Sequence, residues 1–503
     1  MTNPPLDPSA NEAIRTAARR AADAAREQQR AATNPAEAEH GSWLTRPGPV
    51  PVPWRAEEIA AAVREGTLTA TDAVTESLAR IEAHDSELGA FQQVRAAAAL
   101  AEAAEFDADP ARSSLPLAGV PISIKDNVAV AGEPMRDGSA ASPDAPQAAD
   151  HPVVEALRAA GAIVVGTTRV PELCLFSETD STFGITRNPW NPSLTSGGSS
   201  GGAATSVAAA MVPLAHGNDG LGSVRIPAAC TGLVGIKPGR GVVPAQLGAH
   251  DWFGMSENGL LGVSVTDVAL GLSALAGRPI EASDELPPLK IAVSTKSPLV
   301  GPGPDAAFVR AVNSTATVLA RHGHEVEQAD PVYPQRAAIQ AIARWFAAAA
   351  DDADDLAAHG GDLRRLERRT KTHAALGRLT RKLPVVSDGF TARFREQSEQ
   401  FLTEHDVLIT PALAQPPIAA KTWSRESWLA TMLGTVNWTP FAAPWNIAGF
   451  PAMVVPTGTL HPAARTPMAV QLVARPGQEA LLLSVARQIH ALRPWPAHPP
   501  AYT

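Results

Sequence analysis

Two serines flanked by glycine are the residues of this chain best suited to covalent chemistry. Ser199 lies in GGSSGG, and Ser223 lies in GLGSVRIP, 24 residues further along. Flanking glycines let the backbone approach a reacting group and adopt angles that other residues resist. They also free successive N–H groups to point the same way, as an oxyanion-binding nest requires. The pattern therefore favours a nucleophilic serine in one of these loops.

Two simpler interpretations of this stretch compete with that one. Runs of glycine and serine are usually flexible linkers. A linker, however, would not lead into the small apolar segment Ala203 to Ala209, which suits a short buried helix. A phosphate-binding loop would end in Gly-Lys-Ser/Thr or keep a G-x-G-x-x-G register, and the stretch does neither. Both alternatives are the weaker interpretations.

A nucleophilic serine needs a base, and the candidate is Lys125. Val120 to Ile124 is a short apolar stretch typical of a buried strand, and Lys125 ends it. A buried lysine is costly unless it is neutral or paired, and the neutral amine can accept a proton. A lone lysine usually reaches the surface instead. The combination with the two serines is what singles out Lys125.

The three residues together match the catalytic signature of a known family. Lys125 lies in GVPISIKD, Ser199 is the first serine of GGSSGG, and Ser223 is the serine of DGLGSVRIP. In this arrangement the chain resembles the amidase signature family, whose members use a serine–serine–lysine triad. The resemblance covers roughly Ala56 to Leu492 and extends to TRVPE, FGITRNPW and NIAGFPA.

The resemblance implies a role for each matching residue. Ser223 corresponds to the nucleophile, Ser199 to the serine that follows a cis peptide bond and relays protons, and Lys125 to the base. The backbone N–H groups of an oxyanion hole are expected at Gly220, Leu221, Gly222 and Ser223. Three further residues are expected to support the site: Asp219, Arg225 and Ser200. No cofactor or metal is implied.

Two positions depart from the family pattern. Leu221 stands where the family usually has a second glycine, and Val263 stands where many relatives carry arginine. A leucine N–H still serves an oxyanion hole if the residue tolerates the local backbone angles. Neither change removes a member of the triad. The predicted activity therefore stands, whereas the substrate becomes harder to infer.

The activity implied by the resemblance is hydrolysis of a carboxylic acid amide to the acid and ammonia or an amine. The expected reaction is that of a general amidase acting on carbon–nitrogen bonds in linear amides, through a serine acyl-enzyme. One alternative is the glutaminase A subunit of a tRNA-dependent amidotransferase. That subunit typically has Arg-Gln-Pro after the nucleophile, where this chain has Arg225, Ile226 and Pro227. The other alternative is a non-catalytic binding protein on the same scaffold.

Composition narrows the partners. The 503 residues carry a formal charge of −9 and no concentrated basic block, which argues against nucleic acid as the main ligand. Cys174 and Cys230 are not in a metal-ligand pattern, and a single disulfide stays open. No run of about 18 apolar residues and no signal-peptide pattern is present. We expect a small-molecule amide substrate, no membrane span and a cytoplasmic location, and leave a homodimer open.

The order of helical and strand patterns indicates an α/β protein. The resemblance implies the amidase signature fold, a large mixed sheet with helices on both faces. Residues 1–50 are expected to form an N-terminal extension and connector, because a helical pattern at Ser9 to Thr33 has only Ile14 as a large aliphatic residue. Residues 51–503 are expected to form the catalytic domain. Within it, the weakly patterned region 333–402 should form a helical cover beside the site.

Individual elements follow from hydrophobic periodicity. Helices are expected at Ala56 to Arg64, Thr71 to His84, Ala96 to Phe106, His151 to Ala160, Phe308 to His322 and Glu479 to Leu492. Strands are expected at Val120 to Ile124, Ala162 to Val165, Leu289 to Ser294, Glu325 to Asp330, Val407 to Pro411 and Met468 to Val473. A group of aromatic residues is expected either in the core or in a pocket wall: Trp423, Trp428, Trp438, Phe441 and Trp445.

Overall fold

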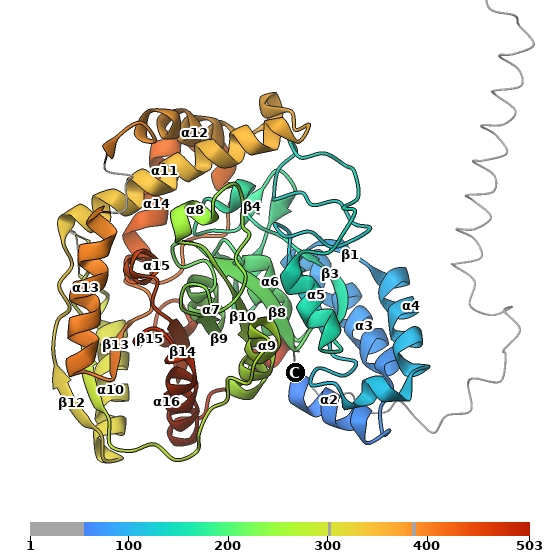
Figure 1. Cartoon of the computed structure of the whole chain (residues 1–503), viewed down its shortest axis with the longest axis horizontal. Helices are drawn as coiled ribbons and strands as arrows, with labels where there is room; N and C mark the ends of the chain where they lie inside the picture. Colours follow the sequence, from blue (N-terminus) through green and yellow to red (C-terminus); the bar gives the residue numbers. More distant parts are fainter. Residues whose placement is uncertain (1–54, 300–302, 385–388, 503) are drawn as a thin grey trace, which may run out of the picture. The chain divides into compact units, whose positions relative to one another are not determined.

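A mixed sheet of 11 strands forms the centre of the fold in this computed structural model, which describes residues 55–299, 303–384 and 389–502 (Figure 1). Its strand order is β1-β3-β2-β8-β10-β9-β14-β15-β13-β11-β12. The strands are β1 (Phe91–Val94), β2 (Pro121–Lys125), β3 (Ile163–Thr168), β8 (Leu214–Asp219), β9 (Val234–Lys237), β10 (Glu257–Gly262), β11 (Lys290–Val293), β12 (Glu325–Gln328), β13 (Val407–Pro411), β14 (Ala452–Leu460) and β15 (Pro467–Val473). The predicted N-terminal helix lies outside the described residues, so that extension stays a prediction.

Strand β2 lies between two parallel neighbours, β3 and β8. In its pairing with β8, Ile122 lies opposite Leu214 and Ser123 lies opposite Ala215. Strands β8, β10 and β9 then pair antiparallel, while β11, β12 and β13 are parallel again. Because parallel strands end at the same edge of a sheet, Lys125 and the end of β8 meet there. The topology therefore brings together two motifs that are far apart in the sequence.

Helices cover both faces of the sheet, as predicted. On β10, Leu260 and Leu261 are consecutive and so point to opposite faces. A Cβ at Gly271 of α9 (Val265–Ala276) would lie 2.6 Å from Leu260, so α9 packs on that face. Helix α6 (Gly201–Ala208) lies on the other face, where Ser200 and Leu261 both approach Gly217.

Most of the remaining helices pack on the sheet, and the others pack against α9. They are α2 (Ala56–Arg64), α3 (Ala70–Leu88), α4 (Ala96–Asp107), α5 (Pro152–Ala159), α7 (Arg225–Thr231), α10 (Ala306–Arg321) and α16 (Glu479–Leu492).

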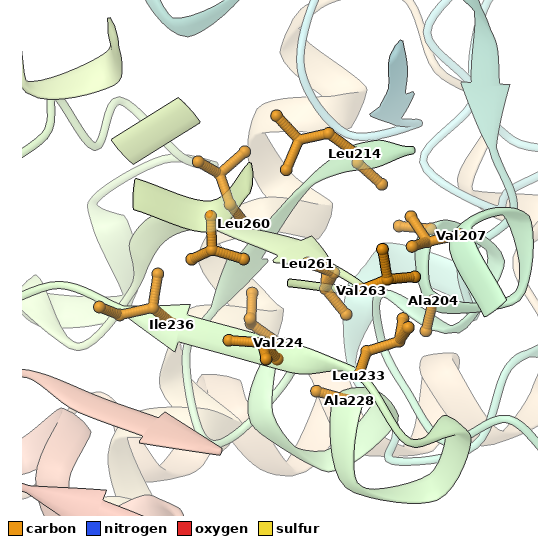
Figure 2. Packing of buried hydrophobic residues seen from close by; sticks show 14 of the residues in the cluster. Ala204, Val207, Leu214, Val224, Ala228, Leu233, Ile236, Leu260, Leu261 and Val263 are labelled. Carbon is orange, nitrogen blue, oxygen red and sulfur yellow. The ribbon is translucent and has the colours of Figure 1, made fainter. Parts of the chain in front are cut away.

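The core around β10 consists of aliphatic side chains from the strands and of small residues from α6 and α7. Figure 2 shows Ala204 and Val207 of α6 and Ala228 of α7 beside the leucines of the sheet. All three are buried. Small side chains let these two helices lie close to the sheet, which holds the loops at their N-terminal ends in place.

A group of helices packs together above the sheet in Figure 1, and we call it the cover; three of its members lie largely in the region 333–402. Its members are α11 (Gln335–Ala358), α12 (Arg368–Thr380) and α13 (Gly389–Glu404), together with α8 (Asp251–Gly254), α14 (Trp428–Trp438) and α15 (Ala443–Ala448). Helix α11 packs against α12, α13, α15 and α8, and α12 packs against α14.

The aromatic group is divided between core and periphery. Trp438, Phe441 and Trp445 are buried, whereas Trp423 and Trp428 are only partly buried. None of the five lines the hollows described below. The pocket-wall interpretation is therefore wrong for this group, because residues between them, such as Thr435 and Pro440, line a hollow instead.

Two open points concern a disulfide between the cysteines and a helix that could span a membrane. Cys174 and Cys230 are both buried free thiols, so the disulfide that was left open does not form. Among the described residues, no helix has the length and apolar character needed to cross a bilayer. The cytoplasmic location stays a prediction.

Candidate active site

Lys125 is a fully buried amine at the end of β2. Its Nζ lies 2.7 Å from Ser199 Oγ, 2.6 Å from Asn218 Oδ1 and 3.3 Å from the Asn218 carbonyl oxygen. Asn218 is held in turn, since its Nδ2 donates to Asn127 Oδ1 at 2.7 Å. Burial lowers the pKa of Lys125, and its interactions with Cys174 and nearby acidic groups oppose that shift only in part. The surroundings thus favour a neutral amine aimed at Ser199.

Ser199 follows a tight glycine turn. The peptide bond between Gly198 and Ser199 is cis. A Cβ at Gly198 would lie 2.8 Å from the carbonyl oxygen of Phe176, so only glycine fits there. The next residue, Ser200, donates its N–H to the Ser223 carbonyl oxygen at 3.1 Å and its hydroxyl to the Asn218 carbonyl oxygen at 3.3 Å. Ser200 therefore connects the Ser199 turn to the Ser223 loop.

The loop that carries Ser223 is organised by Asp219. Its carboxylate accepts hydrogen bonds from the N–H groups of Gly222 at 2.6 Å and Val224 at 3.2 Å. It also pairs with the guanidinium of Arg225 through two bonds of 2.9 Å. Burial disfavours the charged carboxylate, but the charge and hydrogen bonds of Arg225 outweigh it and hold the pKa of Asp219 well below its usual range.

The predicted oxyanion hole needs one correction. Because the Gly222 N–H already donates to Asp219, it is not available to a substrate oxygen. The N–H groups of Gly220, Leu221 and Ser223 make no hydrogen bond within the described part of the chain. Gly222 instead supplies the backbone angle, with φ 122°, while Leu221 needs no positive φ. A leucine at this departure from the family pattern is thus compatible with the loop.

Ser223 is partly exposed and lies where two hollows meet. Within the described residues its hydroxyl makes no hydrogen bond, and none joins it to Ser199 Oγ. Catalytic hydrogen bonds are often long in the absence of substrate and tighten in the complex. The free hydroxyl faces the space in which a substrate would lie.

The hollow on one side of Ser223 is apolar and has a volume of about 110 Å³. We call it the apolar hollow. Its lining includes Leu221, Ile226, Phe176, Tyr333 and Trp345. Helix α11 supplies part of this wall.

The hollow on the other side, which we call the polar hollow, has a volume of about 450 Å³. Ser199, Asn218 and Gly220 line it, and so does Asp137. Burial raises the pKa of Asp137 to about 7. The thiol of Cys174, which lines both hollows, donates to Asp137 Oδ1 at 3.4 Å.

His216 and Val263 lie away from the reacting atoms. His216 is buried and its Nε2 contacts Asn258 Oδ1 at 2.9 Å, while burial lowers the pKa of His216 to about 3. Val263 is a buried core residue. In the described part of the chain, no group of three or more His, Cys, Asp or Glu residues is arranged to hold a metal ion.

Sequence reasoning missed several residues that complete the site. Asn218 holds Lys125, Asn446 and Gln471 contact Arg225, and Trp252 lines both hollows. Asn218 directly precedes Asp219 in the motif, so its position was a usable signal. Asn446 begins the NIAGFPA stretch, but nothing local showed that it reaches Arg225.

Comparison with known proteins adds independent information. A family model described as Amidase matches residues 72–483. AmiB2 of Mycobacterium tuberculosis is 40% identical over 451 residues, covering 86% of this chain and 94% of AmiB2. AmiA2 of the same organism is 36% identical over 455 residues, covering 86% and 92%.

Solved structures share the fold. The 6-aminohexanoate cyclic dimer hydrolase, solved with its substrate, matches with a TM-score of 0.77 and 26% identity over 89% of this chain and 99% of that one. A bacterial aryl acylamidase of the amidase signature family matches with a TM-score of 0.79 over 89% and 98%. Its identity of 22% supports the shared fold alone.

Proposed function

Because the chain belongs to the amidase signature family, we propose that it hydrolyses a carboxylic acid amide through an acyl-enzyme formed on Ser223. The observation that carries this proposal is the buried contact of 2.7 Å between Lys125 Nζ and Ser199 Oγ. It supports a proton relay in which a neutral lysine acts through a serine. Ser223 is the other hydroxyl of the predicted triad, and it lines both hollows.

Acylation begins when Ser223 Oγ attacks the carbonyl carbon of the amide. The Ser223 proton passes to Ser199 Oγ, whose own proton passes to Lys125 Nζ. The carbonyl oxygen becomes an oxyanion, and the N–H groups of Gly220, Leu221 and Ser223 are the proposed donors. Such donors act most strongly when they are fixed before the reaction. Asp219 and Arg225 support them by fixing the loop.

Collapse of the tetrahedral intermediate breaks the carbon–nitrogen bond. Lys125 returns its proton through Ser199 to the leaving nitrogen, which departs as ammonia or an amine. Water then attacks the ester on Ser223 and gives a proton to the same relay. The relay returns that proton to Ser223 Oγ as the ester bond breaks and the carboxylic acid leaves. The relay ends in its starting protonation state, so no cofactor enters the balance.

The proposed substrates are linear amides with a neutral, apolar acyl group. The support comes from the apolar hollow, whose wall includes Phe176, Ile226 and Trp345 and contains no lysine or arginine among its described residues. A carboxylate on the acyl group would lose its hydration there without gaining a cationic partner. Hydrolysis of amides of monocarboxylic acids is therefore the narrower activity that we propose.

The test is a hydrolysis screen over aliphatic, aromatic and amino-acid amides, with the acid and the amine both measured. A fluorophosphonate probe should label Ser223 in the same preparation, as located by mass spectrometry. Labelling with release of acid and amine in equal amounts is the expected result. Faster hydrolysis of glutamine than of simple amides, with a copurifying B subunit, would favour an amidotransferase glutaminase instead. Absence of labelling and turnover would favour a binding protein.

A further inference from the structure

Trp252 occupies the boundary between the two hollows. It lines both of them and is only 8% exposed. Its ring lies on the oxyanion loop, since a Cβ at Gly220 would come within 2.8 Å of Trp252 Cε3. The indole is therefore part of the wall beside the proposed reacting carbonyl.

The cover helix α11 holds this tryptophan in place. Trp252 Nε1 donates to Asp352 Oδ2 at 2.9 Å, and the Ala249 N–H donates to Asp352 Oδ1 at 3.0 Å. Both carboxylate oxygens thus fix the segment that carries the indole. This anchor comes from the helical cover, whereas Gly220 comes from the catalytic loop. Trp252 is where the two regions meet.

The hollows on the two sides of Trp252 differ in chemistry and size. The polar hollow contains the acidic side chains of Asp137, Asp352 and Asp355 together with His359, and none of the described residues that line it is a lysine or an arginine. Its 450 Å³ far exceeds what an ammonia molecule needs, since one water molecule takes about 30 Å³ of liquid. The apolar hollow offers about 110 Å³ and no carboxylate.

The proposed mechanism assigns one half of the substrate to each hollow, and this step rests on that mechanism. Ser199 must deliver a proton to the leaving nitrogen. Ser199 lines the polar hollow and not the apolar one. The amine must therefore lie in the polar hollow, and the acyl group must extend past Leu221 into the apolar hollow.

We propose that Trp252, anchored by Asp352, separates the two halves of the substrate, so that the enzyme prefers N-substituted amides whose amine is large and cationic over primary amides. A cationic amine meets carboxylates in the polar hollow, while the indole keeps it out of the apolar hollow. Trp252 is a specificity-determining residue in this scheme. Asp352 is a positioning residue that acts through the indole and also adds negative charge to the amine side.

The first experiment compares three amides of butanoic acid: butanamide, N-butylbutanamide and N-(4-aminobutyl)butanamide. We expect kcat/KM to increase in that order, with about tenfold or more between the first and the last. Hydrolysis of butanamide at an equal or higher kcat/KM, with Ser223 still acylated, would overturn this inference and leave the proposed function intact. No acylation of Ser223 by any of the three would instead count against the proposed function.

Variants then test the two residues. Trp252→Ala opens the wall and should remove most of the preference for the cationic amide. Trp252→Phe keeps an aromatic ring but loses the N–H donor. This variant is less disruptive to folding than Trp252→Ala and should lower the same ratio by less. Asp352→Asn should lower it as well, chiefly through the KM of the cationic amide.

A double mutant separates anchoring from charge. Trp252→Phe and Asp352→Asn disrupt one hydrogen bond, so their effects on N-butylbutanamide should be less than additive. Trp423→Phe and Asp354→Asn are the matched controls, because both side chains are partly exposed and line neither hollow. They should leave the ratios of kcat/KM among the three amides unchanged. Unchanged ratios in folded Trp252→Phe and Trp252→Ala would refute the role of Trp252.

Discussion

Two buried arginines brace the site from different regions, and their surroundings differ. Arg225, at the start of α7, uses all five of its N–H donors. Two bonds go to Asp219, and one each goes to Asn446, Gln471 and the Ala442 carbonyl oxygen. One guanidinium therefore faces one carboxylate, and the other acceptors are neutral.

Arg369, on the cover helix α12, faces three carboxylates. Its nitrogens lie 2.9 Å from Glu367, 3.1 Å from Asp180 and 3.4 Å from Glu178. Its guanidinium also lies 4.2 Å from the centre of the Phe176 ring, which lines the apolar hollow. This cluster ties the cover to the wall of the site.

The two arginine sites differ in charge balance. The support around Arg225 stays fixed, whereas the support around Arg369 depends on pH. The Asp219–Arg225 pair is neutral as a whole, and the pKa of Asp219 is low. In the Arg369 cluster, three carboxyl groups surround one guanidinium. Burial raises the pKa of Glu178 to about 8 and that of Glu367 to about 7, because one arginine cannot balance three buried carboxylates. Catalysis is thus proposed to rest on the region whose charges stay constant.

At the catalytic site, Ser223→Ala should have the largest effect on turnover. Turnover should fall by at least about 10⁴-fold, because no acyl-enzyme can form. The variant should keep its fold, since the Ser223 hydroxyl has no hydrogen bond to lose within the described residues. Rate measurements and thermal unfolding check this together. An acyl group found by mass spectrometry on Ser199 or Ser200 would contradict the assignment.

Lys125→Ala should follow, with a loss of about 10³-fold or more, because the relay loses its final acceptor. Only the neutral amine accepts a proton, so the wild-type rate should rise with pH through the pKa of Lys125, which burial lowers. The profile of kcat/KM against pH, on one amide and its matching ester, should lose this ionisation in the variant. Lys125→Arg should not rescue it, since guanidinium does not deprotonate. An unchanged alkaline limb in Lys125→Ala would mean that another residue is the base.

The two arginine sites are compared directly by Asp219→Asn and Glu367→Gln. Asp219→Asn leaves the buried Arg225 without a counter-charge, which should lower the free energy of unfolding by about 3–5 kcal/mol. Glu367→Gln leaves two carboxylates beside Arg369 and should cost less. Denaturant unfolding of both variants measures the difference. Equal losses would show that charge balance does not distinguish the two sites.

Glu178→Gln tests the pH dependence of the cover. The folded state holds the Glu178 proton up to a pKa of about 8, whereas the unfolded state releases it near ~4.3. Stability from this group therefore falls as pH rises from about 4.3 to 8. The variant should remove that part of the slope, on the order of 1–3 kcal/mol. Glu426→Gln, at an exposed ion pair with Lys421, is the control. Unfolding curves between pH 5 and 8 that stay parallel for wild type and Glu178→Gln would contradict it.

The smallest expected effect concerns the proposed N-terminal extension. A protein that begins near Gly48 should keep kcat/KM within about twofold, because Ser9 to Thr33 has only Ile14 as a large aliphatic side chain to bury. Steady-state kinetics on one amide suffices. A large loss of rate with normal unfolding would place the extension among the parts that support the site.

Much of the fold followed from local patterns. The strand ending in Lys125 and the buried helix after Ser199 are both present, because short apolar runs bounded by glycine or proline leave few alternatives. The aromatic group was harder. The clustering of aromatic residues between Trp423 and Trp445 did not show which of them would be buried, since that depends on how α14 and α15 pack.

The oxyanion loop shows the same division within a few residues. The order DGLGS predicts an anion-binding turn, and these residues form a bend at the end of β8. Which N–H groups stay free was decided by the Asp219 carboxylate, which takes Gly222 and Val224. A carboxylate that folds back on its own loop selects donors by geometry, and residue order does not reveal that geometry.

The sequence by itself determined the chemical groups of this protein: a lysine at a strand end, two glycine-flanked serines and an aspartate beside an arginine. Tertiary structure alone decided how they are used. It placed Lys125 2.7 Å from Ser199 through the parallel pairing of β2 and β8. It also brought Asp352 from the cover to Trp252 across 100 residues. Contacts between distant segments depend on the packing of whole layers, and no local spacing carries that information.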